Sequence, residues 1–273
     1  MLPETSRFLK NHRADEMQAV ATASSSNLLE LSADPGMLDS MRRLLLLIFL
    51  TGTLTAGAAV QKEYILVSGG PSLIEWEKFK ATPHDRWWGN FIRSARVRIE
   101  EIRKQQGPDA QITWLVYKPG YVRRAERQDK ADLIGNILSV RDKYHVNLVW
   151  ISSGDDIINY LNAGRPRSEV KIADFEYYGH SNRACFLLDY SNEIDSASKS
   201  WLHENELKKL HRGLFSRDAF VKSWSCHTGE SMSKRWRSAT GKKMIGAIGK
   251  TDYSNGHERN WTPALSPGAR WGG

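Results

Sequence analysis

Short apolar runs alternate with longer amphipathic stretches from Gln61 onward, and this alternation constrains the fold more than any other feature of the chain. The runs are rich in β-branched and aromatic residues and have ordinary strand length. A strand followed by an amphipathic helix is the repeating unit of a mainly parallel sheet with helices on its faces. We therefore expect a three-layer α/β/α sandwich. The candidate strands are Tyr64–Val67, Ile112–Tyr117, Asn147–Ile151, Val170–Tyr178, Ala219–Trp224 and Met244–Ile248.

The stretches between these runs have the spacing and the end signals of helices. In the first two, apolar side chains recur at helical intervals. A serine cap marks the start of the third, and a glycine marks the end of the fourth. The expected helices are Trp87–Gln105, Lys130–Tyr144, a short helix from the cap Ser153 to Asn162, and Ser231–Ala239 before Gly241.

The chain has 273 residues, which is enough for one α/β domain with a full core and a leader. We expect this domain to span residues 60–255. Residues 256–273 contain Pro263, Pro267 and Gly268, so we expect an irregular C-terminal tail on the surface.

Residues 41–59 have the pattern of a secretory signal peptide. Two arginines precede the apolar run Leu44–Leu50, and Ala56-Gly57-Ala58 provides a small-residue cleavage site. The alternative is an uncleaved N-terminal anchor, which would be the only contact with a membrane. Residues 1–40 are polar and rich in serine, and we interpret them as a mis-assigned start or a disordered extension. We therefore expect an exported protein, either periplasmic or secreted.

The chain carries a net positive charge. Lys and Arg number 39 against 31 Asp and Glu, a balance of +8. This favours anionic neighbours such as phosphates, envelope polymers or acidic proteins. Zinc-finger spacing, an RNP-type motif and a long basic arm are all absent from the sequence, so specific nucleic-acid binding is not expected.

Two of the candidate strands end in residues that carry chemistry. One ends in Gly179-His180-Ser181, and a later one ends in Ser225-Cys226 and leads into a helix. In an open parallel sheet the carboxyl ends of adjacent strands converge on the crevice that binds ligands. A thiol becomes a nucleophile beside a histidine and a helix N-terminus. We therefore expect His180 to face Cys226, with backbone amides near both to stabilise an oxyanion.

This order of motifs resembles the caspase-like cysteine peptidases over roughly Asn147–Asp252. In that family an apolar strand ends in Gly-His-(Gly or Ser), and a later strand ends in (Ala or Ser)-Cys. The resemblance implies a caspase-like fold and a peptidase that needs no cofactor. It also implies that Cys226 attacks the scissile carbonyl of a peptide or protein substrate while His180 protonates the leaving amine. By the same match, the amides of Ser181 and Cys226 form the oxyanion hole.

The chain departs from the family pattern in two ways. Ser181 stands where the family usually has glycine, and the caspase pentapeptide is absent, so cleavage after aspartate is not expected. Asp252 follows the last candidate strand and is a candidate pocket carboxylate for a basic side chain.

Other interpretations of the same residues remain open. Cys226 is an inert core thiol in one of them and forms a disulfide with Cys185 in another. A third groups His180, Cys185, Cys226 and His227 as zinc ligands, although their spacing is unusual for such a site. His227 alone is expected to be a bystander on the opposite face of a strand. At the level of function, the alternative to a hydrolase is an envelope-associated binding or structural module without catalysis.

Overall fold

The computed structural model describes residues 60–72, 87–190 and 200–273, so the predicted N-terminal extension, 1–40, and the predicted signal peptide or anchor, 41–59, lie outside the described residues. A five-stranded sheet in the order β3-β2-β1-β4-β8 forms the centre. All four of its pairings are parallel, which confirms the expected α/β class with a mainly parallel sheet. Its strands are β1 (Gln61–Ser68), β2 (Gln111–Tyr117), β3 (Asn147–Ile151), β4 (Val170–Tyr178) and β8 (Phe215–Ser223).

β1 is the central strand, and its position explains its composition. It pairs with β2 on one side and with β4 on the other. Side chains from Glu63 to Ser68 are buried whichever face of the sheet they occupy. A strand covered on both faces has no solvent side, so it shows a continuous apolar run such as Tyr64–Val67 instead of a polar alternation.

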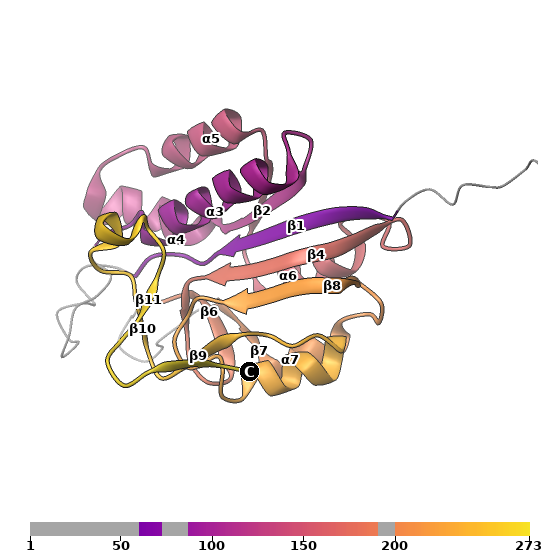
Figure 1. The fold of residues 1–273 in the computed structure, drawn as a ribbon. Helices are drawn as coiled ribbons and strands as arrows, with labels where there is room; N and C mark the ends of the chain where they lie inside the picture. The colour runs from indigo at the N-terminus through magenta and orange to yellow at the C-terminus, as the bar shows by residue number, and fades with distance from the viewer. Residues whose placement is uncertain (1–59, 73–86, 191–199) are drawn as a thin grey trace, which may run out of the picture. The chain divides into compact units, whose positions relative to one another are not determined.

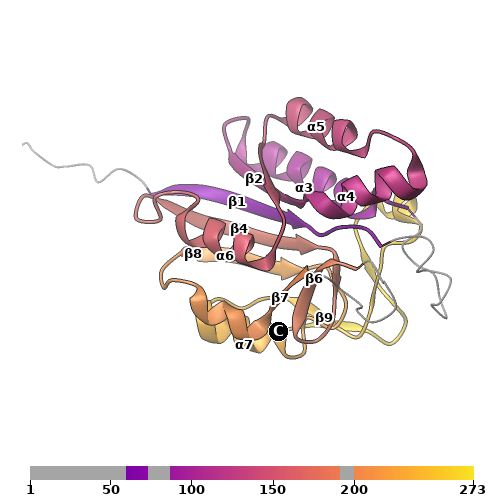
Figure 2. The same ribbon diagram turned by 180° about the vertical axis from the view of Figure 1, so that it is seen from behind.

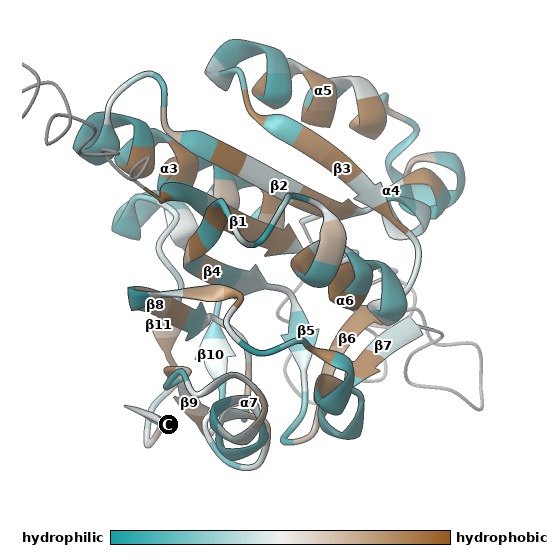
Figure 3. Cartoon of the chain, turned by 90° about the vertical axis from the view of Figure 1, so that its right-hand side faces the viewer, coloured by the Kyte–Doolittle hydropathy of each residue, from teal (hydrophilic) through white to brown (hydrophobic). Residues whose placement is uncertain are grey.

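Helices cover both faces of the central sheet (Figures 1 and 2). One apolar layer lies between the sheet and the helices on one face, and a second lies between the sheet and the helices on the other face. Figure 3 shows apolar colour where the helices face the strands. None of the described helices has both the length and the apolar character needed to cross a membrane. The helices on the first face are α3 (Asn90–Gln106), α4 (Lys118–Arg124) and α5 (Leu133–Tyr144), and those on the second are α6 (Gly154–Ala163) and α7 (Met232–Thr240).

The helix ends follow local chemistry that the sequence shows. Ser153 caps α6 in a reciprocal arrangement with Asp156, and Gly164 follows its last turn. α7 ends at Gly241, whose positive φ of 72° suits a residue without a Cβ. α4 and the π-helical turn Ala125–Asp129 after it were not expected.

β4 contains a bulge at Ala173. In both of its pairings the register shifts between Ile172 and Asp174. Ile172 packs in the apolar layer of α6 and α7, whereas Asp174 reaches Arg98 of α3 on the other face. The extra residue therefore reverses the face on which each later side chain of β4 lies.

A small antiparallel sheet, absent from our expectations, lies beyond the end of β4. It has the order β5-β6-β7. β5 begins two residues after β4 ends, so the chain turns away from the central sheet at Gly179. The strands are β5 (His180–Ser181), β6 (Cys185–Asp189) and β7 (Ser200–His203), and a 3-10 turn, Glu204–Lys209, follows them.

The expected strand Met244–Ile248 does not join the central sheet as a full strand. Only Ile245 bridges to β8, at Lys222, and β9 (Gly246–Ile248) pairs with a strand of the tail. A Cβ on Gly246 would lie 2.5 Å from the backbone N of Gly229, so the two backbones approach with no side chain between them. This contact draws β9 toward the loop that follows Cys226.

The C-terminal tail, expected to be irregular, contains two short strands. β11 (Ala264–Leu265) pairs with β10 (Thr251–Asp252), and β12 (Arg270–Gly272) pairs with β9. Strands of two or three residues leave no periodic pattern in a sequence. The tail therefore pairs with β9 and β10, which follow Cys226 in the sequence.

The amino-terminal end of the sheet contains a buried ion pair. Glu63 is fully buried and accepts hydrogen bonds from Arg167, Thr113 and Tyr160. The Thr113 and Tyr160 hydroxyls each lie 2.7 Å from Oε1. A buried charge that loses its partner is left uncompensated in a medium of low polarity.

We predict that Glu63→Gln lowers the free energy of unfolding by about 3 kcal/mol, because it leaves the Arg167 guanidinium buried without a counter-charge. Urea denaturation followed by circular dichroism measures the change. The control is Lys62→Ala, which removes the solvent-exposed pair with Asp218 and should leave the midpoint unchanged. Equal midpoints for all three proteins would contradict the prediction.

Candidate functional site

His180 and Cys226 follow adjacent strands of the central sheet. β4 and β8 are parallel neighbours, and Tyr177 pairs with Ser223 at their carboxyl ends. Both strands end before these residues, and His180 already pairs with Leu187 of β6, so His180 and Cys226 lie beyond the last pair of the ladder. The Ser181 hydroxyl donates a hydrogen bond to the Cys226 carbonyl, so the two segments are in direct contact. Figure 1 shows the arrowheads of β4 and β8 ending side by side, next to the later strands β9 to β11.

Aromatic rings hold the His180 side chain. It is largely buried, with 9% of its surface exposed. Phe91 of α3 contacts the imidazole edge-on, with ring centroids 5.1 Å apart. The centroid of the Tyr190 ring lies 4.5 Å from that of the imidazole. The Tyr177 hydroxyl donates to the His180 carbonyl at 2.9 Å. The ring and the backbone of His180 are therefore both positioned by neighbouring groups.

The Cys226 thiol is partly exposed and contacts β10. The backbone N–H of Thr251 donates to Sγ at 3.3 Å, and the Thr251 hydroxyl lies 3.5 Å from the same sulfur. A backbone donor aimed at sulfur stabilises negative charge there. Sequence reasoning missed Thr251, since its contact with Cys226 joins residues 25 positions apart.

Two backbone N–H groups near the thiol, those of Ser181 and Cys226, make no hydrogen bond to β6. Asn182 donates to the Cys185 carbonyl, which makes these two residues a hydrogen-bonded pair of the β5–β6 hairpin. Hydrogen-bonded and non-bonded pairs alternate along antiparallel strands, so Ser181, opposite Phe186, points its N–H away from β6. Among the described residues, the Cys226 N–H also has no acceptor. These are the two amides that the family resemblance implies for an oxyanion hole.

Asp252, the candidate pocket carboxylate, already has partners. Its Oδ1 accepts from the backbone N–H of Ser254 at 2.7 Å and from the Ser254 hydroxyl at 2.6 Å. Its Oδ2 lies 3.7 Å from the Arg259 guanidinium. A basic side chain of a ligand would therefore compete with Arg259 for this carboxylate.

Phe91 and Tyr253 complete the surroundings of the site, and the sequence indicated neither. Phe91 contacts Tyr253 as well as His180, with ring centroids 4.9 Å apart. The Tyr253 hydroxyl donates to the Trp224 carbonyl at 3.0 Å, two residues before the cysteine. The helical spacing of apolar residues in α3 agrees with the burial of Phe91, but it does not indicate a contact with the histidine.

His227 does not lie on a strand, contrary to our expectation. Its φ of 63° places it in the left-handed region. Its Nδ1 lies 2.8 Å from Oε1 of Glu230, so it belongs to a local hydrogen-bonded turn instead of facing away.

The disulfide and zinc interpretations are not supported by the geometry. Both cysteines are free. No three His, Cys, Asp or Glu side chains in the described part of the chain, which includes all four candidate ligands, come together as a metal site. Burial, and to a lesser degree Glu204 and Glu206, raises the pKa of Cys185 to about 11.

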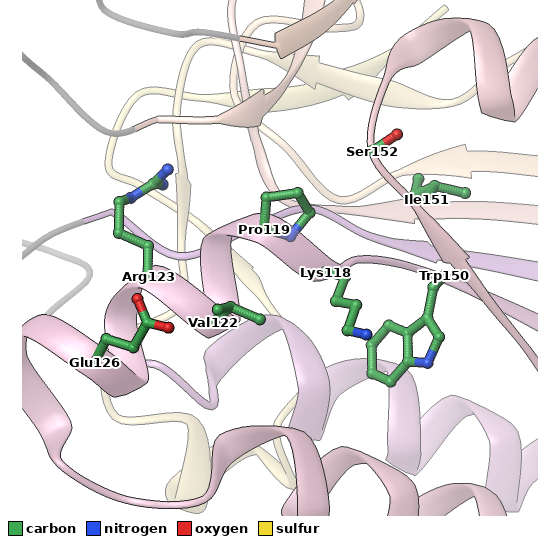
Figure 4. Close-up of a pocket in the computed structure, with 8 residues that line it drawn as sticks. All are labelled: Lys118, Pro119, Val122, Arg123, Glu126, Trp150, Ile151 and Ser152. Atoms are coloured by element: carbon green, nitrogen blue, oxygen red, sulfur yellow. The ribbon is translucent and has the colours of Figure 1, made fainter.

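A pocket of about 380 Å³ lies at the other edge of the sheet (Figure 4). It is formed by α4, the π-helical turn after it and the carboxyl end of β3, and β3 and β8 are the two edge strands of the sheet. The Lys118 ammonium lies 5.6 Å from the Trp150 ring centroid in its wall. Its lining holds no histidine or cysteine, so we place the candidate site at Cys226. The lining residues are Lys118, Pro119, Val122, Arg123, Glu126, Trp150, Ile151 and Ser152.

We predict that Cys226 is the only thiol of the native protein that iodoacetamide labels at about pH 8. A pKa of about 11 leaves Cys185 almost entirely in the unreactive thiol form, and its thiolate fraction rises only as the pH approaches that value. Peptide mapping by mass spectrometry measures both sites, and labelling in urea provides the control. Equal labelling of the two cysteines in the native protein would contradict the structure.

No family model, curated protein or solved structure matches this chain.

Proposed function

We propose that this protein is an exported thiol hydrolase, most consistent with a caspase-like cysteine endopeptidase that uses Cys226 and His180. The observation that supports the proposal most strongly is the hydrogen bond from the Ser181 hydroxyl to the Cys226 carbonyl, which joins the two segments that carry His180 and Cys226. The parallel pairing of β4 with β8, which ends at Tyr177 and Ser223, brings both segments to the same edge of the sheet. The leader at residues 41–59 supports export, with an uncleaved anchor as the alternative.

The reaction divides into two acyl-transfer steps. His180 accepts the proton of the Cys226 thiol, and the sulfur attacks the scissile carbonyl carbon, so that a carbon–sulfur bond forms as the carbonyl oxygen gains negative charge. The N–H groups of Ser181 and Cys226 donate to that oxygen. His180 then protonates the leaving amine, the carbon–nitrogen bond breaks, and an acyl-enzyme remains. Water, deprotonated by His180, attacks the acyl group and releases the acid and the free thiol.

Thr251 contributes to the first step. Its backbone N–H donates to the Cys226 sulfur and so supports negative charge on the nucleophile before attack. The rings of Phe91 and Tyr190 limit rotation of the His180 imidazole. These neighbours come from α3, the end of β6 and β10, so the site depends on elements far apart in sequence.

We expect Cys226→Ala and His180→Ala each to lower the cleavage of a peptide library by roughly a thousandfold or more, because nucleophile and acid act as a unit. The matched control is Cys185→Ala, which removes the other thiol and should keep the activity. Cleavage is read by mass spectrometry of the products. Labelling of Cys226 by iodoacetamide is measured in His180→Ala and Cys185→Ala as well, and it should slow in His180→Ala.

The alternative is a non-catalytic envelope-associated module, which the net charge of +8 makes chemically reasonable. Cleavage that survives in Cys226→Ala, or labelling of Cys226 that is indifferent to His180, would reject the hydrolase. Salt-sensitive binding to a polyanion would then identify the module.

A further inference from the structure

The residue after the nucleophile has an unusual backbone conformation. His227 has a φ of 63°, which is unfavourable for a residue with a Cβ. Neighbouring groups must therefore hold it in place, and such conformations gather at functional sites. The left-handed turn redirects the chain directly after Cys226, ahead of the helix α7.

A closed set of hydrogen bonds surrounds this turn. The His227 N–H donates to the Gly249 carbonyl at 2.7 Å, and the His227 imidazole lies 2.8 Å from Glu230 Oε1. The Gly249 N–H reaches the same carboxylate oxygen at 3.4 Å, and the Glu230 N–H donates to the His227 carbonyl at 3.2 Å. We name His227, Glu230 and Gly249 together the clip.

The clip joins the two segments that meet at the sulfur. His227 is adjacent to Cys226, and Gly249 precedes Thr251 by two residues. The Thr251 N–H is the group that donates to the Cys226 sulfur. Anchoring Gly249 to the turn therefore fixes where Thr251 lies relative to the thiol.

Charge strengthens the clip. The hydrogen bond from His227 is the largest cause that lowers the pKa of Glu230; burial opposes it, and the Gly249 N–H adds to it. The other charge facing this carboxylate is Arg183, in the turn between β5 and β6, which also lowers the pKa. Because the pKa is lowered, the carboxylate form persists to lower pH than in an ordinary glutamate. The clip is present above that pKa and is lost as the pH falls through it.

We propose that His227 and Glu230 are positioning residues that hold the Cys226 thiol against Thr251 for reaction. The inference deepens the proposed function and rests on it for its catalytic meaning. The reactivity of the thiol can be measured separately from any peptidase activity.

The test uses three variants of the full chain. His227→Gly keeps the left-handed turn but removes the imidazole, His227→Asn tolerates the turn and keeps a side-chain donor, and Glu230→Gln removes the charge. We expect Cys226 in His227→Gly and Glu230→Gln to react with dipyridyl disulfide about tenfold more slowly than in the wild type, because the thiol is misplaced. His227→Asn should recover part of the rate. His257→Gly, at an exposed histidine of the tail, is the matched control.

The pH profile separates positioning from a general loss of structure. The ratio of the Glu230→Gln rate to the wild-type rate, measured from about pH 3 to about pH 8, should rise toward one at acid pH, where the wild type also loses the carboxylate. A constant ratio across that range, or wild-type rates in His227→Gly and Glu230→Gln, would overturn the proposal. Thermal unfolding confirms that each variant is folded. The peptidase proposal fails on different observations, namely cleavage that survives in Cys226→Ala or labelling of Cys226 that is unchanged in His180→Ala. The two failures are therefore distinguishable.

Discussion

β4 pairs with a neighbour on each side, and the bulge at Ala173 shifts the register of both pairings. If the strand ran through Ala173 without a bulge, Ile172 and Asp174 would lie on the same face, and every later side chain of the strand would change sides. With it, Phe175 and Tyr177 enter the layer of α6 and α7. Asp174 and Glu176 instead face Arg98 of α3 on the other side of the sheet.

α3 is anchored to this part of β4 by charge. Arg98 forms ion pairs with Asp174 and with Glu176, both of which are buried. Burial and the neighbouring Glu176 raise the pKa of Asp174, and the Arg98 guanidinium opposes this shift by stabilising the carboxylate. Phe91 lies two turns earlier on the same face of α3 and contacts His180.

Glu176, one of these two carboxylates, also contacts the segment that leads to Cys226. The Trp224 indole N–H donates to Glu176, and the Trp224 ring stacks on Tyr178 at the end of β4. The same buried ion pairs therefore position two neighbours of the site. They hold α3, which carries Phe91, and they bind Trp224, two residues before Cys226.

Features with a local cause could be predicted from the sequence. The apolar face of α3, the Ser153 cap and the glycine that ends α7 each depend on residues within a few positions of one another. The strand-end positions of His180 and Cys226 followed from the same local patterns. The sheet β5-β6-β7 and the Thr251 contact could not be predicted, because they depend on how distant segments meet. His227 was misjudged for a related reason: the strand ends before it, and the left-handed turn removes the alternation on which the expectation relied.

The glycine pair at positions 229 and 246 limits how this region can vary over evolution. A Cβ at Gly229 would lie 2.5 Å from the Gly246 carbonyl oxygen, and a Cβ at Gly246 would lie 2.5 Å from the Gly229 nitrogen. In each case the obstacle is backbone, which no exchange of side chain on the other segment can remove. A compensating second substitution is therefore unavailable at this contact. Change in the loop between Cys226 and α7 must instead come from residues whose side chains point away from β9.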